Sequence, residues 1–264
     1  MRFCTLVSGS SGNSSLVMAG DTKILVDSGR SGKYIENCLK NVSVDAAQID
    51  CILVTHEHID HTASAGILSR RYDIPIYTTY GTWQGMQNMN VLGKVKDENR
   101  HIIEANKPFA INNIEITAFP IPHDAAEPVG YIFKTPKACL VVATDMGYLC
   151  DEAKDALYGA DIVLLESNYD VNMLQNGTYP YPLKQRISGA SGHLSNNEAA
   201  LFAARLVQSG TKHIVLGHLS QENNTPECAM KEISREFSSR GIKIGCDVNI
   251  AVAPRHTAGE LIAL

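Results

Sequence analysis

Residues 55–61 read THEHIDH and contain three of the nine histidines of the chain together with two acidic residues. The stretch follows the apolar run CILV at 51–54, which has the character of a buried strand. It precedes TASAGILSRRY at 62–72, whose apolar residues recur with helical spacing. These seven residues are therefore expected to form a turn between a strand and a helix.

The geometry of that turn favours a metal site. In extended backbone His56 and His58 point to the same side, and Asp60 and His61 stand where the following helix begins. Either Asp60 or Thr62 is a suitable cap for this helix. Imidazoles and a carboxylate packed so closely repel one another on protonation unless a cation binds their lone pairs. A solvated turn without a ligand is the weaker interpretation.

Three further donors follow apolar runs elsewhere in the chain. His123 lies in IPHDA after a predicted strand, Asp145 in TDMG after LVVA, and His218 in GHLS after HIVL. Taken singly, each resembles an ordinary polar residue at a strand end. Their shared position after a strand favours one common site, and zinc accepts imidazole and carboxylate ligands of this kind.

Composition and charge limit the class of protein. The chain has 264 residues, 44% of them apolar and 19% charged, as in ordinary globular proteins. Its net charge is −5 without a basic cluster, so bulk electrostatics do not indicate binding to nucleic acid or membranes. The seven cysteines form no CxxC pair and read as free thiols. With no signal peptide and no apolar run of about 18 residues, a cytoplasmic location is expected.

Strand and helix patterns alternate without a linker, so a single domain over 1–264 is predicted. The first three strands follow one another through Gly-Ser turns, which indicates an antiparallel meander, and strand–helix alternation comes later. The fold class is therefore α/β or α+β, with mixed sheets and helices outside. Strands are expected at 2–7, 15–19, 22–26, 51–55, 74–78, 114–120, 129–134, 138–143, 162–166, 213–216 and 243–252, and helices at 31–39, 62–72, 80–89, 196–208 and 226–238.

The order of these donors resembles the metallo-β-lactamase superfamily over nearly the whole chain. The resemblance implies a four-layer αβ/βα sandwich and two divalent cations, with zinc expected first and manganese as the alternative. It implies that Asp145 bridges both cations and that Asp27, in ILVDSG, orients the histidine turn. The remaining ligands that it implies are His56, His58 and His123 for one cation, and Asp60, His61 and His218 for the other.

Two more residues separate the branches of that superfamily. Glu166 ends the apolar run in ADIVLLESN, and His193 precedes a helix in SGHLSNNEAA that Ser195 is expected to cap. A strand-end carboxylate in water and a turn histidine are equally good interpretations of the two residues alone. The nuclease branches called RNase Z and β-CASP have a similar glutamate and a similar GH segment. In such enzymes the carboxylate orients an imidazole that acts on the scissile phosphate or on the leaving oxygen.

The opening MRFCTLVSGSSGNSS is similar to the YycJ family, also called WalJ or VicX, whose members are regarded as exonucleases. The expected activity is two-metal hydrolysis of DNA in the 5′ to 3′ direction, in which both cations lower the pKa of the attacking water. Its candidate catalytic residues are His193, Glu166 and Asp60. A metallohydrolase for thioesters, lactones or nucleotide phosphodiesters is the alternative, and a silent regulatory module is third.

The expected partner is single-stranded DNA or RNA, and no membrane association is expected. Residues 176–192 interleave Tyr179, Tyr181, Lys184 and Arg186 with Pro and Gly close to His193. Tyrosines there would stack on unpaired bases while the cations meet phosphates. An ordinary surface loop with both tyrosines packed on the core is slightly favoured. Trp83 is expected to be a packing residue.

Overall fold

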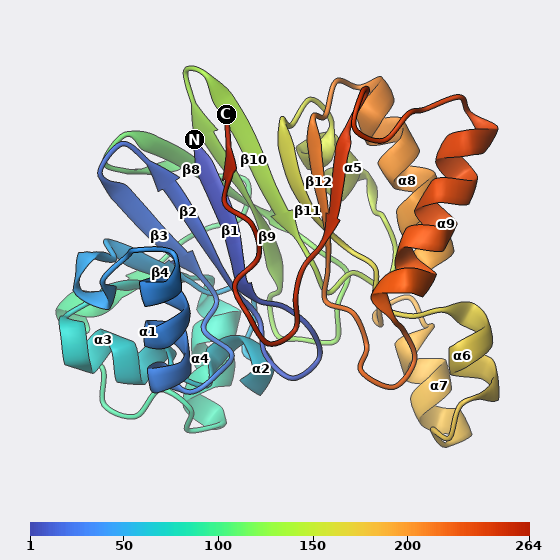
Figure 1. Cartoon of the computed structure of the whole chain (residues 1–264). Coiled ribbons are helices and arrows are strands. Elements are labelled where there is room, and N and C mark those ends of the chain that lie inside the picture. The colour runs from blue at the N-terminus through green and yellow to red at the C-terminus, as the bar shows by residue number, and fades with distance from the viewer. The chain divides into compact units, whose positions relative to one another are not determined.

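The computed structural model describes residues 1–264, which divide into two compact units. Unit 1 consists of Met1–Pro120, Ala125–Ala138 and Pro254–Leu264, and unit 2 consists of Ile121–Asp124 and Cys139–Ala253. Figure 1 shows the elements in chain order by colour. The single domain over 1–264 stays a prediction beside this division.

Unit 1 contains a seven-stranded mixed sheet. Its first three sequential strands pair antiparallel, which confirms the predicted meander, and the later ones pair parallel. The inner strands are buried along almost their whole length. In spatial order the strands are β14 (Ile262–Ala263), β1 (Arg2–Val7), β2 (Ser14–Ala19), β3 (Thr22–Val26), β4 (Cys51–Leu53), β5 (Ile76–Thr78) and β6 (Arg100–Ile102).

Helices of unit 1 pack on this sheet through one continuous apolar core. Ile35, Leu68 and Met86 from three different helices join every second residue of β1 and β2 in that core. Trp83 is 3% exposed and belongs to the same core, which confirms its predicted packing role. The helical segments are α1 (Gly32–Asn41), η1 (Ala46–Gln48), α2 (Ile59–Thr62), α3 (Ala65–Tyr72), α4 (Tyr80–Asn88) and η2 (Asp97–Asn99). An antiparallel group of β7 (Phe109–Ile111), β8 (Ile114–Pro120) and β9 (Val129–Thr135) completes the unit.

The helix predicted over 62–72 differs from the structure at its start. The segment is split into α2 and α3, whose N-caps are His58 and Ser64, so the prediction that Asp60 or Thr62 caps it is wrong. The backbone N–H and the hydroxyl of Ser64 both donate to the carbonyl of Ser28, at 3.0 and 3.2 Å. These tertiary bonds hold the turn between the two helices, and local sequence does not reveal them.

Unit 2 is built on four parallel strands joined by helical crossovers. Parallel strands covered on both faces read as continuous apolar runs, and β11 is buried at all five positions. The strands are β10 (Ala138–Ala143), β11 (Ile162–Glu166), β12 (His213–Gly217) and β13 (Asn249–Val252), in this spatial order. The helices are α5 (Asp151–Leu157), α6 (Val171–Asn176), α7 (Tyr181–Ile187), α8 (Asn196–Gln208) and α9 (Pro226–Ser239).

Two segments of unit 2 depart from the predicted pattern. Only 249–252 of the strand predicted at 243–252 pairs with a neighbour. Before it, Gly245 has a φ of +83°, and the Lys243 N–H donates to the Asp247 carboxylate at 2.7 Å, which makes a turn. The loop expected at 176–192 contains α7, which has a proline in its first turn, a position that helices tolerate.

None of the helices combines the length and the apolar character needed to cross a bilayer, and the longest, α9, has 14 residues. The cytoplasmic location stays a prediction.

Candidate metal centre and acid–base pair

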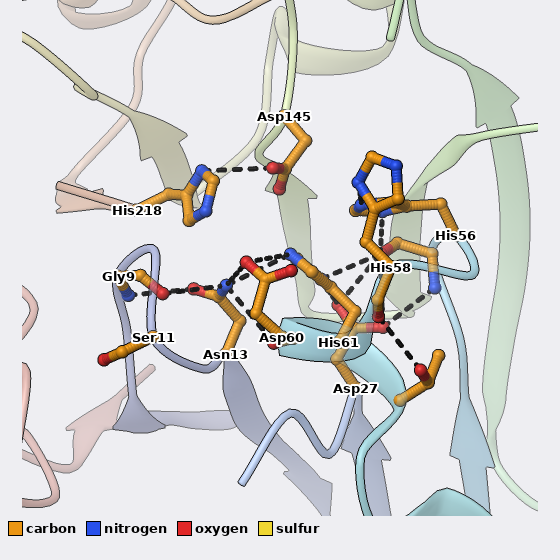
Figure 2. Close-up of polar contacts among 12 residues, drawn as sticks. Gly9, Ser11, Asn13, Asp27, His56, His58, Asp60, His61, Asp145 and His218 are labelled. Carbon is orange, nitrogen blue, oxygen red and sulfur yellow. Dashed lines mark hydrogen bonds and ion pairs between the residues drawn. The ribbon is translucent and has the colours of Figure 1, made fainter. Parts of the chain in front are cut away.

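Unit 1 brings the donors of the THEHIDH turn together directly after β4. The ring centroids of His56 and His58 lie 4.6 Å apart at an interplanar angle of 80°, and those of His56 and His61 lie 4.1 Å apart. His56 and His61 are fully buried, and Asp60 lies in the first turn of α2. Three imidazoles and a carboxylate thus cluster as the sequence predicts, and Figure 2 shows them.

Asp27 and Thr55 fix the orientation of this cluster. The Asp27 Oδ2 atom lies 2.8 Å from Nδ1 of His61, and Asp27 also accepts hydrogen bonds from the backbone and hydroxyl of Thr55. Burial raises the pKa of Asp27, while the charge of His61 and these hydrogen bonds partly offset that rise. A carboxylate on Nδ1 sets the tautomer in which Nε2 carries the lone pair for a cation. Asp27 therefore has the contact that the resemblance implies.

Asn13 is a site residue that sequence reasoning missed. Its backbone N–H donates to the carbonyl of Asp60 at 2.7 Å, and its side-chain Nδ2 lies 3.0 Å from Nε2 of His61. Its own carbonyl accepts from the N–H of Gly29 at 2.8 Å. The SGSSGNSS loop thereby holds the THEHIDH turn in place, as Figure 2 shows. The only feature of the sequence that could have suggested this role for Asn13 is its place in a distinctive loop before a buried strand.

Unit 2 brings the three strand-exit donors together. His218 Nδ1 lies 3.1 Å from Oδ1 of Asp145, a pair drawn in Figure 2, and His123 Nε2 lies 3.9 Å from the same oxygen. The His193 ring lies between the other two imidazoles, with centroid distances of 5.2 Å to His123 and 5.1 Å to His218. His123, Asp145 and His218, which each come after a strand in the sequence, therefore lie close together in unit 2.

Backbone strain marks three of these positions. Asp27, Asp145 and His218 all have left-handed backbone, with φ of 59°, 63° and 55°. Such conformations are disfavoured for residues other than glycine and persist only where the surrounding structure fixes them. Asp27 and His218 directly follow β3 and β12, and Asp145 lies two residues after β10, so the strain turns each side chain close to a strand end.

Glu166 is the centre of the donor cluster in unit 2. Its Oε1 accepts from Nδ1 of His193 at 2.8 Å and from Nδ1 of His218 at 2.9 Å. Its Oε2 accepts from the backbone N–H of Met146 at 2.7 Å and from that of Leu194 at 3.3 Å. Burial alone would raise the pKa of Glu166, but the charges and hydrogen bonds of the two histidines outweigh it and lower the pKa.

The structure therefore brings Glu166 and His193 into the contact that the sequence predicts, and adds one that it does not. His218 shares the same carboxylate oxygen. The register of β11 and β12 pairs Glu166 with Gly217, so the parallel strands place Glu166 beside the residue that precedes His218. Carboxyl ends of adjacent parallel strands meet at one edge of a sheet, which is the signal that would have suggested this contact.

A network of buried amide side chains holds the backbone at His218. Asn168 Nδ2 donates to the carbonyl of His218 at 2.8 Å. Asn224 bonds to the carbonyl of Asn168 and to the side chain of Asn196, which itself accepts from Ser167 at 2.6 Å. All these side chains are buried, so an unpaired amide would be costly. Sequence reasoning missed this network, because amides in SNNEAA and ENNTP read as surface residues.

The donors fit divalent cations on their own chemistry. Ligand atoms of Asp145, Glu166, His193 and His218 all lie within 4.8 Å of one another, and three of these residues are buried. In unit 1 the imidazole of His61 is oriented by the Asp27 carboxylate, the arrangement that supports bound metal in proteins. Neutral imidazole and carboxylate are ligands for zinc and, less selectively, for manganese.

Comparison with known proteins places this donor set in a family. Residues 22–219 match the model of the beta-lactamase superfamily domain. The metallo-β-lactamase fold protein YhfI from Bacillus subtilis superposes with a TM-score of 0.71 at 18% identity, covering 98% of this chain and 99% of that one. The chain therefore belongs to the metallo-β-lactamase superfamily and has its α/β sandwich fold, as the sequence predicts.

Closer relatives narrow the family. Exodeoxyribonuclease WalJ of Streptococcus pneumoniae is 38% identical over 260 residues, covering 98% of this chain and 97% of that protein. Exodeoxyribonuclease YycJ of Bacillus anthracis is 38% identical over 245 residues, covering 93% and 92%. Within the superfamily the chain belongs to the WalJ/YycJ family. Together with the histidine and aspartate clusters, this membership implies divalent metal ions.

Proposed function

We propose that this protein is a metal-dependent exodeoxyribonuclease. The observation that carries the proposal is its 38% identity, over nearly the full length of both chains, to exodeoxyribonuclease WalJ. The pairing of Glu166 with His193 supports it, because an oriented imidazole is suited to acid–base work on a phosphodiester. Single-stranded DNA as substrate and cleavage from the 5′ end are further parts of the proposal.

The ligand assignment is part of the same proposal. His56, His58 and His123 would hold one cation, Asp60, His61 and His218 the second, and Asp145 would serve both. Its support is the donor set in each unit and the oriented state of His61 and His218, whose Nδ1 atoms face carboxylates. Zinc is the first expectation for these ligands, with manganese as the alternative.

When bound, the two cations would supply a water of lowered pKa and a charge clamp for the phosphate. The protein residues then have separate tasks. Glu166 accepts the Nδ1–H of His193 and so favours the doubly protonated imidazole, whose Nε2–H would donate to the phosphate or give its proton to the leaving oxygen. Asp27 and the backbone of Asn13 hold the THEHIDH turn in one arrangement, and Asp60 would serve as a ligand at the reacting centre.

A net charge of −5 does not oppose a nucleic-acid substrate. Two bound divalent cations would add four positive charges at the donor clusters, so the local potential there would be positive on an acidic protein. Bulk charge then reduces affinity and leaves the chemistry unaffected.

The proposal is tested with strands labelled at one end. Purified protein is incubated with 5′-labelled and 3′-labelled DNA and RNA, single- and double-stranded, in separate series with zinc, manganese and magnesium. Stepwise shortening of DNA from the 5′ end is the expected result. Cleavage confined to chromogenic esters, lactones or small nucleotide diesters would replace the proposal with the small-molecule hydrolase, which the relatives support less well.

The role of His193 is tested by His193→Ala. DNA cleavage should fall by about 10²- to 10⁴-fold, the usual contribution of a positioned acid or base, with metal content unchanged. His256→Ala is the control, because His256 is exposed and its only contact in the structure is through its backbone carbonyl. Undiminished turnover of the His193 variant would remove the assigned role.

A further inference from the structure

A cavity of about 390 Å³ lies between α6 and α7 in unit 2. Its lining includes Tyr169, Leu174, Gln175, Tyr181, Lys184 and Ser188. The lining is mainly apolar and aromatic, with one cation. A volume of this size accepts a group as large as a nucleobase, and such mixed linings are typical of ligand sites.

Tyr181 is an exposed aromatic residue that does not pack in the core. It is the first residue of α7, a helix with no buried residues, and is 70% exposed. The interpretation of 176–192 as a loop with both tyrosines packed on the core is therefore wrong for Tyr181. Its hydroxyl accepts from Gln185 Nε2 at 2.9 Å while the side chain stays largely exposed. An exposed aromatic ring is suited to stacking.

Residues 171–192, which contain α6 and α7, carry a net positive charge on a chain whose net charge is negative. Between Val171 and Gly192 there is no Asp or Glu, and the two charged residues are Lys184 and Arg186. Arg186 is paired with Asp124 at 2.5 Å. Lys184 Nζ donates to the carbonyl of Gln175 at 2.8 Å, which joins α7 to α6 and uses one of its three donors. On a protein of charge −5, this segment complements a polyanion.

Backbone hydrogen bonds join residues at the cavity to His193 and to Asn196, three residues further on. The carbonyl of Ile187, next to Ser188, accepts from the backbone N–H of His193 at 2.9 Å. On the other side, the carbonyl of Tyr169 accepts from the N–H of Asn196 at 2.8 Å. The cavity and the segment that carries His193 are thus joined by backbone hydrogen bonds within unit 2.

We propose that the α6–α7 cavity receives an unpaired base of the DNA strand being cleaved, with Tyr181 stacking on the base and Lys184 meeting a neighbouring phosphate. This inference rests on the proposed exodeoxyribonuclease activity and assigns the substrate class as single-stranded. Duplex DNA offers no base to the cavity, because its bases are paired and stacked on one another.

Binding is measured by fluorescence anisotropy with metal-loaded protein and a labelled phosphorothioate dT oligonucleotide. Tyr181→Ala should raise the Kd by about 5- to 100-fold, the usual effect of removing one stacking ring. Tyr80→Ala is the matched control, since Tyr80 is the first residue of α4 and is 58% exposed. Lys184→Gln should weaken binding and flatten its salt dependence by about one phosphate contact.

An abasic series identifies the base. One abasic site is moved along the oligonucleotide, and each position is tested on wild type and on Tyr181→Ala. The expected result is one position, close to the cleaved end, where loss of the base weakens binding to wild type and does not weaken binding to the variant. Equal sensitivity of both proteins at every position, or an unchanged Kd for Tyr181→Ala, overturns the inference.

The two proposals fail in different ways. Wild type that does not shorten DNA with any of the three metals contradicts the exodeoxyribonuclease. Wild type that shortens DNA, with Tyr181→Ala matching it in Kd and KM, contradicts the cavity alone.

Discussion

Asp27 and Glu166 are both buried carboxylates beside histidines, yet their pKa values move in opposite directions. Burial raises the pKa of both. At Asp27 one imidazole and the Thr55 donors only partly offset it, whereas Glu166 has two imidazoles and two backbone N–H groups and its pKa falls. Since nearby positive charge and hydrogen bonds to the charged form both favour ionisation, the second imidazole beside Glu166 decides the outcome. Glu166 is thus built to stay an anion.

Asp27→Asn should lower the affinity for divalent metal by about 10- to 100-fold, because residues that orient a ligand contribute that much to affinity. The amide loses the charge that favours the Nδ1–H tautomer of His61. Metal affinity is measured by competition with a chromogenic chelator. Asp21→Asn, at an exposed turn of the same unit, is the control, and equal affinity of both variants would contradict the role of Asp27.

Glu166→Gln should reduce both metal affinity and DNA cleavage, because the carboxylate contacts His218 as well as His193. The amide NH₂ would also face a backbone N–H of Met146 or Leu194. His193→Ala should reduce cleavage alone, so metal analysis beside kinetics separates the two variants. Glu222→Gln, exposed in the same unit, is the control. A Glu166 variant with full metal content would show that its contact with His218 is dispensable.

At the scale of elements, the short loops around Asn13 and Gly29 position the THEHIDH turn through close backbone contacts. Gly29 lies so close to the ligand turn that an added Cβ would meet the Asp60 carbonyl oxygen at 1.6 Å. The backbone nitrogen of Asn13, in the loop between β1 and β2, would be 2.7 Å away. Both neighbours are backbone, so neither yields by changing a rotamer. The approach of these loops depends on the absence of a side chain at this position.

Gly29→Ala should destabilise the fold by about 1–3 kcal/mol or more, the usual range for overpacking, and should reduce bound metal by displacing Asp60. Urea unfolding and elemental analysis measure the two effects. Gly32→Ala, three residues further on, is the control, because its nearest contact is the end of the Ile67 side chain at 3.3 Å. Similar unfolding free energies for both variants would contradict the close approach.

Elements with strong local signals were predictable from the sequence. Helix α8 begins after Ser195, whose capping box with Glu198 is visible in SNNE, and its predicted range of 196–208 matches the structure. Helix α7 was not predicted, because YPYPLKQR has two prolines and no buried face to give a periodic signal. The strand expected from 243 was too long, because a glycine turn there interrupts an apolar-looking run.

For the whole molecule, the proposed metal ligands come from segments spread between His56 and His218 in a chain of 264 residues. The sequence suggests them because they lie near strand ends and because the set resembles that of a known family. The contact of Asn13 with His61, and those of Asn168 and Glu166 with His218, could not be predicted, since they depend on which loops meet after folding. Candidate ligands are thus easier to propose from the sequence than the residues that orient them.

Metal removal should destabilise the whole protein. A cation that binds only the folded state adds about 2.7 kcal/mol when its concentration is 100 times its Kd. Thermal unfolding after chelation and dialysis should therefore occur several degrees lower, and should recover when zinc or manganese is added. His218→Ala is the comparison, since loss of a ligand should shrink the shift. An identical unfolding temperature with and without metal would contradict a bound cation.

The left-handed backbone at Asp27, Asp145 and His218 has a consequence for sequence variation. The residue at each of these positions must both supply a donor atom and tolerate a positive φ. Asparagine and aspartate tolerate that region better than glutamate, glutamine or the β-branched residues. In a saturation library, chemically similar replacements should retain activity more often at Asp60 than at Asp145, which has a positive φ. The strained positions should therefore tolerate the fewest substitutions.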